Sequence, residues 1–265
     1  MHGLQLKIIG FWIDSNLGTI SIPPSAVTDT ISAIDVFVSI LSQKHALRDW
    51  SHLAGWLNWT LNVFPWGCPA LFELYRKTAG KTWSYALIYI NREVVEALHW
   101  FKETLPRTIG VHLVDSGYWD DHTADMVMFT DASLKIALSF VYSNCGFLYQ
   151  LNTPSGSVSH SVDIFFLEQL AIVSALHHAA TRATPPRRVL IFSDSLDAVY
   201  AFHTLAVTEA MHNACLFAAA TIVASTGIDF RVRHINGTDN VRAIESTTEP
   251  FSSLSSYDVV GPDIA

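Results

Sequence analysis

Hydrophobic spacing divides the chain into a helical first part and a mixed second part. Up to about residue 104, apolar residues recur mostly every three or four positions, which is the spacing of amphipathic helices. A β-hairpin comes first, within residues 4–22, with its turn near Asn16–Gly18. Ser25 is the expected N-cap of the first helix. The predicted helices span Ser25–Leu41, Leu47–Phe64, Pro69–Thr78 and Asn91–Thr104.

The pattern changes near residue 121 to short runs that alternate or are wholly apolar, which is typical of strands. The order of the predicted elements is βββαβαβ. That order predicts an α/β fold with a mixed five-stranded sheet and flanking helices, preceded by a mainly helical domain. The elements are strands Asp125–Asp131, Lys135–Tyr142 and Gly146–Leu151, helix Asp163–Thr181, strand Arg188–Ser193, one or two helices in Ser195–Thr226 with a break near Val207–Glu209, and strand Ile228–Ile235.

Composition narrows the class of protein. Half of the 265 residues are hydrophobic, 15% are charged and the net charge is −8, so the chain lacks the basic field of a non-specific nucleic-acid binder. Three separated cysteines make neither a disulfide framework nor a zinc spacing, and we expect an intracellular protein, cytoplasmic or nuclear. The most apolar long window, Ala214–Ser225, is too short to span a bilayer, so no membrane partner is expected.

Three acidic residues stand where the pattern predicts burial. Asp131 and Asp194 each end an apolar strand, and Glu168 lies on the apolar face of its predicted helix. If the two strands are neighbours, their acids lie side by side, and the helix that covers the sheet brings Glu168 to them. Three carboxylates this close repel one another unless cations bind, and oxygen-only ligands select Mg²⁺ or Mn²⁺. The sequence therefore predicts a divalent-metal site.

A structural role for the acids is the alternative. Each could cap the end of an element, and Asp194 in particular could N-cap the helix that starts at Ser195. Other chemistries find less support. The Ser193–Ser195 run has no partnered histidine for a serine hydrolase, and no glycine-rich phosphate loop occurs. Of the twelve histidines, none except His234 is predicted to serve a site.

Four motifs, MVMFTDAS, FFLEQLAIVSAL, VLIFSDS and HINGTDNVRA, occur in an order and on element types that fit one family. Together they resemble the type 1 ribonuclease H domain of retrotransposon reverse transcriptases, over roughly residues 124–246. The resemblance implies a ribonuclease H-like sheet and metal-dependent endonucleolytic hydrolysis of RNA in RNA–DNA hybrids. It maps the first three catalytic acids, which bind Mg²⁺ or Mn²⁺, to Asp131, Glu168 and Asp194.

The last motif both extends the resemblance and departs from it. His234 matches the histidine that assists proton transfer or product release, and Asn240 the asparagine before the closing helix. The family has an aspartate where Ile244 stands, and Glu245 cannot replace it because one residue turns a helix by about 100°. We expect a weakened two-ion site, with activity lowered by orders of magnitude. A catalytically inactive module that binds hybrids or proteins is the alternative.

The first half resembles other parts of reverse transcriptases. KIIGFWIDSNLGTISIPP is similar to the end of the palm, and SHLAGWLNWTLNVFPWGCPALFELYRK to thumb and connection helices. No Tyr-x-Asp-Asp or equivalent acid pair occurs, so polymerisation is not expected, and the remaining reverse-transcriptase domains are possible partners besides nucleic acid. The predicted domains are a palm-end hairpin (1–24), a thumb/connection-like region (25–120), a ribonuclease H-like domain (121–246) and a disordered tail (247–265).

Overall fold

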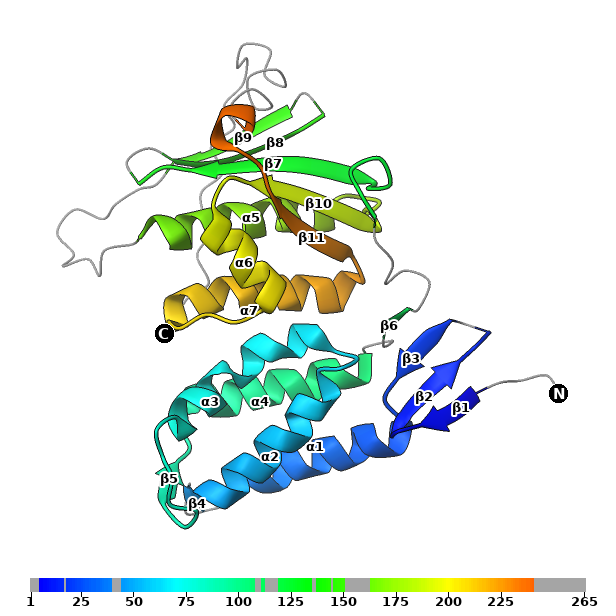
Figure 1. The fold of residues 1–265 in the computed structure, drawn as a ribbon, viewed down its shortest axis with the longest axis vertical. Helices are drawn as coiled ribbons and strands as arrows, with labels where there is room; N and C mark the ends of the chain where they lie inside the picture. Colours follow the sequence, from blue (N-terminus) through cyan, green and yellow to red (C-terminus); the bar gives the residue numbers. More distant parts are fainter. Residues whose placement is uncertain are drawn as a thin grey trace. The chain divides into compact units, whose positions relative to one another are not determined.

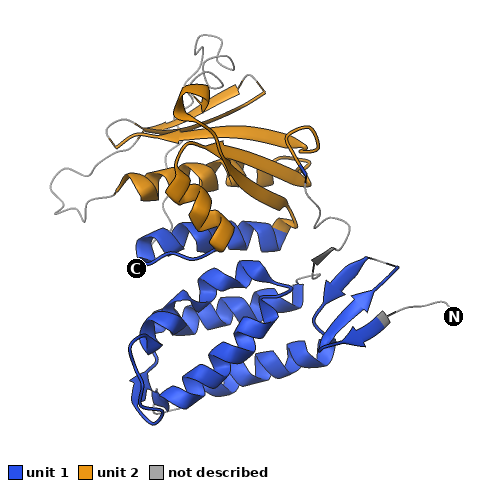
Figure 2. Cartoon of the chain, in the orientation of Figure 1, with its two compact units in different colours: residues 1–119, 205–225 blue, residues 120–204, 226–265 orange. Residues whose placement is uncertain are grey.

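A computed structural model describes residues 5–16, 18–39, 44–107, 111–112, 119–134, 137–143, 145–150 and 163–240. The chain forms two compact units (Figure 2). Unit 1 comprises residues 1–119 and 205–225, and unit 2 comprises residues 120–204 and 226–265. Ile244, the predicted closing helix beyond residue 240 and the predicted tail from residue 247 lie outside the described residues.

Unit 1 begins with an antiparallel sheet rather than one hairpin. Its strands β1 (Gln5–Ile8), β2 (Phe11–Asp14), β3 (Thr19–Ser21) and β6 (Val111–His112) lie in that order. The single predicted hairpin is incomplete, because Ile9 and Gly10 form a further tight turn between β1 and β2, with φ of 50° and 87°. Glycine suits this turn because of its positive φ, and because a Cβ at Gly10 would lie 3.1 Å from the Trp59 ring. The turn predicted near Asn16–Gly18 is present, and Asp14 Oδ1 accepts a hydrogen bond from the Asn16 N–H.

Helices form the rest of unit 1. They are α1 (Pro24–Val38), α2 (Leu47–Thr60), the 3₁₀ segments η1 (Pro65–Leu71) and η2 (Leu105–Arg107), α3 (Phe72–Thr78) and α4 (Arg92–Thr104), with the short strands β4 (Lys44–Ala46) and β5 (Leu87–Tyr89). Ser25 is not a cap, because α1 begins one residue earlier at a proline, which needs no partner for an N–H. Asn91 does cap α4 and accepts a hydrogen bond from Val94. Aromatic and aliphatic side chains close the core, with Trp50 and Phe101 fully buried.

Helix α7 (Ala210–Thr226) packs on the core of unit 1, although the sequence had grouped it with the later domain. Asn213 Nδ2 donates to the Pro69 carbonyl (3.0 Å), and Trp100 Nε1 donates to Thr221 Oγ1 (3.1 Å). The Phe217 ring lies 4.7 Å from the Trp100 ring. Within the described part of the chain, no helix has the length and apolar character needed to cross a membrane.

Unit 2 is a mixed five-stranded sheet with flanking helices, as the sequence predicted (Figure 1). The strands are β7 (Met126–Ala132), β8 (Ala137–Tyr142), β9 (Cys145–Gln150), β10 (Arg188–Ser193) and β11 (Asp229–His234), in the order β11-β10-β7-β8-β9. The pairs β7–β8 and β8–β9 are antiparallel, whereas β7–β10 and β10–β11 are parallel. Helix α5 (Ile164–Ala180) packs on β7, β8 and β10, and α6 (Leu196–Thr204) packs on β10 and β11.

The register of β7 and β10 positions the candidate site. Thr130 pairs with Ser193 in the parallel ladder, so the carboxyl ends of the two strands lie at the same edge of the sheet. The Thr130 hydroxyl also donates to the Phe192 carbonyl (3.1 Å), and the Phe129 and Phe192 rings stack 5.3 Å apart. These contacts fix the strand ends that carry two of the three predicted acids.

Candidate metal centre

The three acids predicted from the sequence come together in unit 2. Asp131 lies at the end of β7, Glu168 lies in the second turn of α5, and Asp194 directly follows β10. One carboxylate oxygen from each residue lies within 4.8 Å of the others. Glu168 is only 6% exposed and the two aspartates are half-buried, so the carboxylate cluster of Asp131, Glu168 and Asp194 is largely shielded from water.

Helix α5 carries Glu168 into the cluster because the start of the helix is fixed and the face that bears Glu168 is otherwise apolar. The Asp163 carboxylate caps the helix and accepts a hydrogen bond from the Phe166 N–H (2.7 Å). One turn further along from Glu168, Ala171 and Ile172 are fully buried against the sheet. An acid placed within this apolar surface cannot turn to solvent without moving the helix.

Asp194 does not serve as the cap of α6. The N–H of Ala198 donates instead to the Ser195 hydroxyl (3.3 Å), so Ser195 supplies the capping contact. The Asp194 carboxylate lies beside Asp131 and Glu168. The capping alternative for this acid was therefore wrong.

Burial and mutual repulsion make full ionisation of the cluster unfavourable. They raise the pKa of Glu168 to about 8, through loss of water first and through the charges of Asp194 and Asp131 second. Hydrogen bonds from the Ala132 N–H and the Ser193 hydroxyl act in the opposite direction and are weaker. The pKa of Asp131 is raised as well, by burial and then by Asp194. Without a cation, the cluster therefore favours the protonated form of Glu168 over full ionisation of all three acids.

The donor set fits a hard divalent cation. All three ligand groups are carboxylates, which is the preference of Mg²⁺ and Mn²⁺. Glu168 Oε2 is buried, and no described residue donates a hydrogen bond to it. A buried oxygen without a hydrogen bond destabilises the folded protein. A bound cation would remove this penalty and would also displace the proton from Glu168.

Two residues of the last motif, His234 and Asn240, differ in their relation to the carboxylate cluster. His234 ends β11 opposite Ser193 and is exposed, but it does not belong to the group of mutually close ligand atoms. Asn240 is buried, and its Nδ2 donates to the Thr130 carbonyl (3.0 Å), directly before Asp131. The sequence assigned these two positions by resemblance alone.

Sequence reasoning missed Gly237. A Cβ at this position would lie 3.2 Å from Asp194 Oδ2, so the backbone of the last motif runs against the carboxylate. The sequence indicated only a turn at Asn236–Gly237. A close approach between segments far apart in the chain leaves no local signal.

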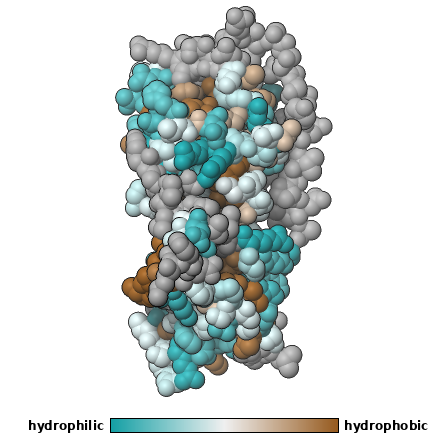
Figure 3. Space-filling view, turned by 90° about the vertical axis from the view of Figure 1, so that its right-hand side faces the viewer, coloured by the Kyte–Doolittle hydropathy of each residue, from teal (hydrophilic) through white to brown (hydrophobic). Residues whose placement is uncertain are grey.

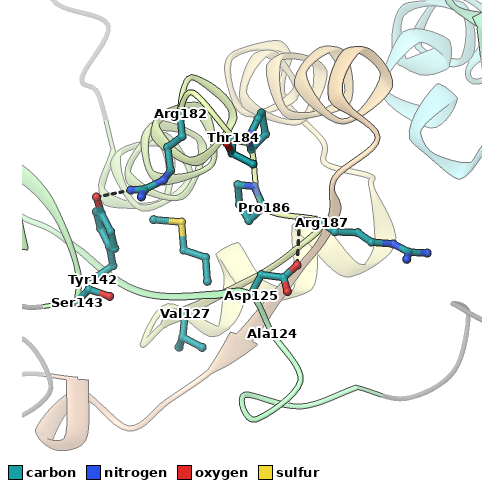
Figure 4. A pocket seen from close by; sticks show the side chains of 11 residues that line it. Ala124, Asp125, Val127, Tyr142, Ser143, Arg182, Thr184, Pro186 and Arg187 are labelled. Atoms are coloured by element: carbon teal, nitrogen blue, oxygen red, sulfur yellow. Dashed lines mark hydrogen bonds between the residues drawn. The ribbon is translucent and has the colours of Figure 1, made fainter.

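A cavity of about 680 Å³ lies away from the cluster, at the start of β7. Arg182 on one side points toward Tyr142 and donates from Nη1 to its hydroxyl (2.6 Å), whereas the Arg187 side chain points away (Figure 4). Asp125 Oδ2 accepts hydrogen bonds from the N–H groups of Arg187 (2.9 Å) and Arg188 (2.8 Å). The lining contains none of the three acids, so we do not assign the candidate chemistry to this cavity.

Comparison with known proteins gives similarity only among solved structures. No protein-family model matches the chain, and no curated protein matches it. Ribonuclease H1 from the halophilic archaeon Halobacterium salinarum aligns over 44% of this chain and 89% of its own, with 13% identity and a TM-score of 0.35. Foamy viral protease-reverse transcriptase in complex with dsDNA aligns over 88% of this chain and 45% of its own, with 13% identity and a TM-score of 0.32.

The same viral protein in complex with an RNA/DNA hybrid aligns over 97% of this chain, with 13% identity and a TM-score of 0.31. The chain spans less than half the length of these viral structures, at 45% and 32%. Scores this low decide neither family nor function. The ribonuclease H-like fold of unit 2 rests on the strand order and strand directions of its own sheet.

Proposed function

We propose that the carboxylate cluster binds divalent metal and hydrolyses the RNA strand of RNA–DNA hybrids endonucleolytically. The observation that carries the proposal is the convergence of three carboxylates from β7, α5 and the end of β10 within 4.8 Å. The substrate comes from the resemblance of the four motifs to ribonuclease H domains of retrotransposon reverse transcriptases. Contacts to 2′-hydroxyls would distinguish the RNA strand from DNA.

The roles of the residues follow from their positions. Bound Mg²⁺ or Mn²⁺ would supply the positive charge that activates water and stabilises the leaving oxygen. Asp131 and Asp194 would hold the cations from the ends of two adjacent strands, and Glu168 would join them as a ligand in its ionised form. His234, at the exposed end of β11, would assist proton transfer or product release, the role that the resemblance of the last motif implies.

An inactive module that binds hybrids or proteins is the second candidate. The observation that favours it is Ile244, an apolar residue where the resemblance requires a fourth carboxylate. The net charge of −8 also disfavours tight binding of a polyanion by the whole surface. Both candidates share the fold and differ in catalysis.

Cleavage of a labelled RNA–DNA hybrid tests the proposal. We would compare the wild type, Asp131→Asn, Ile244→Asp and the control Asp197→Asn, which changes an exposed acid on α6 outside the cluster. We expect metal-dependent cleavage by the wild type and by Asp197→Asn, a loss of at least about 100-fold in Asp131→Asn, and a gain in Ile244→Asp.

Two results would decide against catalysis by this chain. If only Ile244→Asp cleaves, the site is assigned correctly and the natural chain is the inactive module. If no folded variant cleaves with either metal, the hydrolase proposal fails. Thermal unfolding of each variant shows whether it is folded.

A further inference from the structure

Four exposed aromatic and aliphatic side chains lie on strand β5 of unit 1 and on the turn before it. Figure 1 shows the paired strands β4 and β5 at its lower left. Trp83, Tyr85, Leu87 and Tyr89 are 67%, 58%, 66% and 60% exposed, and we call them the aromatic strip. Single exposed apolar residues are ordinary, and the face in Figure 3 shows them at separate places among hydrophilic ones. Four such residues within a seven-residue segment are a local concentration of exposed apolar side chains, which is typical of an interaction site.

Pairing of β4 with β5 directs part of the strip to solvent. In the antiparallel β4–β5 ladder His45 pairs with Ile88, and both side chains are buried. His45 Nε2 hydrogen-bonds the Phe37 carbonyl (2.7 Å), and its ring stacks 4.0 Å from the Phe37 ring. Because strand side chains alternate, burial of Ile88 directs Leu87 and Tyr89 to solvent.

Backbone hydrogen bonds also attach the first half of the strip to helix α2. The N–H of Leu47 donates to the Ala86 carbonyl (2.9 Å), and that of Arg48 donates to the Ser84 carbonyl (3.0 Å). Trp83 and Tyr85 therefore stand on a fixed turn. Binding to them would require little ordering of the chain, which lowers its entropic cost.

Positive charge accompanies the rings. The Lys44 ammonium lies 4.3 Å from the centroid of the Tyr89 ring, and the Arg48 guanidinium lies 5.1 Å from that of Tyr85. Segments 44–49 and 77–89 contain four lysine or arginine residues and one acid, Asp49, although the whole chain carries −8. The strip is thus a local cationic and aromatic surface on an acidic protein.

We propose that the aromatic strip binds single-stranded nucleic acid. Unpaired bases stack on Trp83, Tyr85 and Tyr89, while Lys44 and Arg48 contact phosphates. The Trp83 and Tyr85 rings lie edge to face, with centroids 6.3 Å apart and planes at 61°, so bases that stack on both rings lie on differently inclined planes, as in an unpaired strand rather than a duplex stack. The strip lies in unit 1, and this inference does not depend on cleavage by the carboxylate cluster of unit 2.

Fluorescence anisotropy with labelled oligouridylate and oligothymidylate of about 15 nucleotides tests the proposal on the full chain. We expect Trp83→Ala with Tyr85→Ala to weaken binding at least about tenfold, whereas Trp83→Phe with Tyr85→Phe retains most of it. Tyr200→Ala, which removes an equally exposed tyrosine from α6, should leave the affinity unchanged. Arg48→Gln should lower the slope of log affinity against log salt by about 0.7.

Comparison of the two oligonucleotides shows whether the strip distinguishes RNA from DNA. Equal affinities indicate recognition of bases and phosphates alone, and tighter binding of the RNA adds a contact to the 2′-hydroxyl; both support the site. Unchanged affinity in the folded alanine variant overturns the proposal. So does a loss of self-association in that variant without a loss of affinity, because the strip would then bind a protein surface.

Discussion

Two aspartates at opposite ends of β7 show how the same residue type serves different purposes. Asp125 directly precedes the strand and accepts hydrogen bonds from two backbone N–H groups, at 2.9 and 2.8 Å. Asp131 lies at the other end of the strand, among Glu168 and Asp194. Backbone N–H groups stabilise the negative charge of Asp125, whereas the charge of Asp131 is added to those of two other carboxylates.

The difference is the reason for assigning the proposed metal site to one end of the strand and not to the other. Asp125 joins the start of β7 to the start of β10, so its charge already stabilises the fold. At the other end, burial and repulsion raise the pKa values of Asp131 and Glu168, and one buried oxygen of Glu168 has no donor among the described residues. The three carboxylates destabilise the metal-free protein, and a bound cation would remove their repulsion. This difference in free energy favours metal binding at the cluster.

The largest expected effect is stabilisation by metal. With Mg²⁺ at about 100 times its Kd, binding should add about 2.7 kcal/mol to the free energy of unfolding and raise Tm by about 5–10 °C. Asp131→Asn should abolish this rise, because it removes one of three ligands. Asp125→Asn should keep it, since its carboxylate lies at the far end of β7. Thermal unfolding with and without Mg²⁺ in all three proteins measures the contrast.

Equal loss of the Mg²⁺ effect in both variants would contradict the assignment. The metal would then act on the protein as a whole through its net charge rather than at the cluster. A titration with Ca²⁺ separates specific from general effects further, because a rigid site for small ions binds Ca²⁺ less well.

The second prediction concerns pH in the metal-free protein. Burial and the neighbouring carboxylates raise the pKa of Glu168 from an ordinary 4.5 to about 8 in the folded state, so the folded state holds the proton more tightly. Its contribution to stability is complete below the unfolded pKa and is lost as pH rises through about 8. With EDTA present, Tm should fall by on the order of 5 °C between about pH 5 and pH 9. The Tm of Glu168→Gln should fall less over the same pH range. An equal fall in Tm would show that other titrating groups cause the pH dependence.

Sequence reasoning succeeded where local pattern decides the structure. Strand β10 was predicted with its observed bounds, because a buried strand is wholly apolar and ends at polar residues. The acids were found for the same reason, since a charge within an apolar pattern is visible in the sequence. Their 4.8 Å grouping depended on one further inference, that β7 and β10 are neighbours.

Sequence reasoning failed where distant segments decide the structure. Ile9 adopts a positive φ that its residue type disfavours, and the turn is fixed by pairing of β1 with β2. Strands β4 and β5 have three residues each, too few for a period, and contacts of His45 with Phe37 help to hold them. Glycine 237 belongs to this class as well, because its role depends on Asp194.

The third prediction tests the compensated end of β7. Asp125→Ala leaves the N–H groups of Arg187 and Arg188 without this acceptor, and we expect a loss of about 1–2 kcal/mol of stability, since the site is partly hydrated. Metal affinity should not change. Urea unfolding in EDTA measures the loss, and Asp197→Ala, at an exposed position on α6, is the matched control. If Asp125→Ala loses no more stability than Asp197→Ala, these two hydrogen bonds make no net contribution to the free energy of unfolding.

The smallest expected effect comes from Gly237→Ala beside the cluster. The added methyl group would lie 3.2 Å from Asp194 Oδ2, so either the carboxylate or the backbone must shift by a few tenths of an ångström. We expect a stability change below about 1 kcal/mol but a several-fold weaker Mg²⁺ midpoint in the Tm titration, because a metal ligand is displaced. Gly55→Ala is the control, since its Cβ meets nothing within 4 Å. If both variants keep the wild-type midpoint, Asp194 has room to adjust, and the last motif does not constrain the cluster through its backbone.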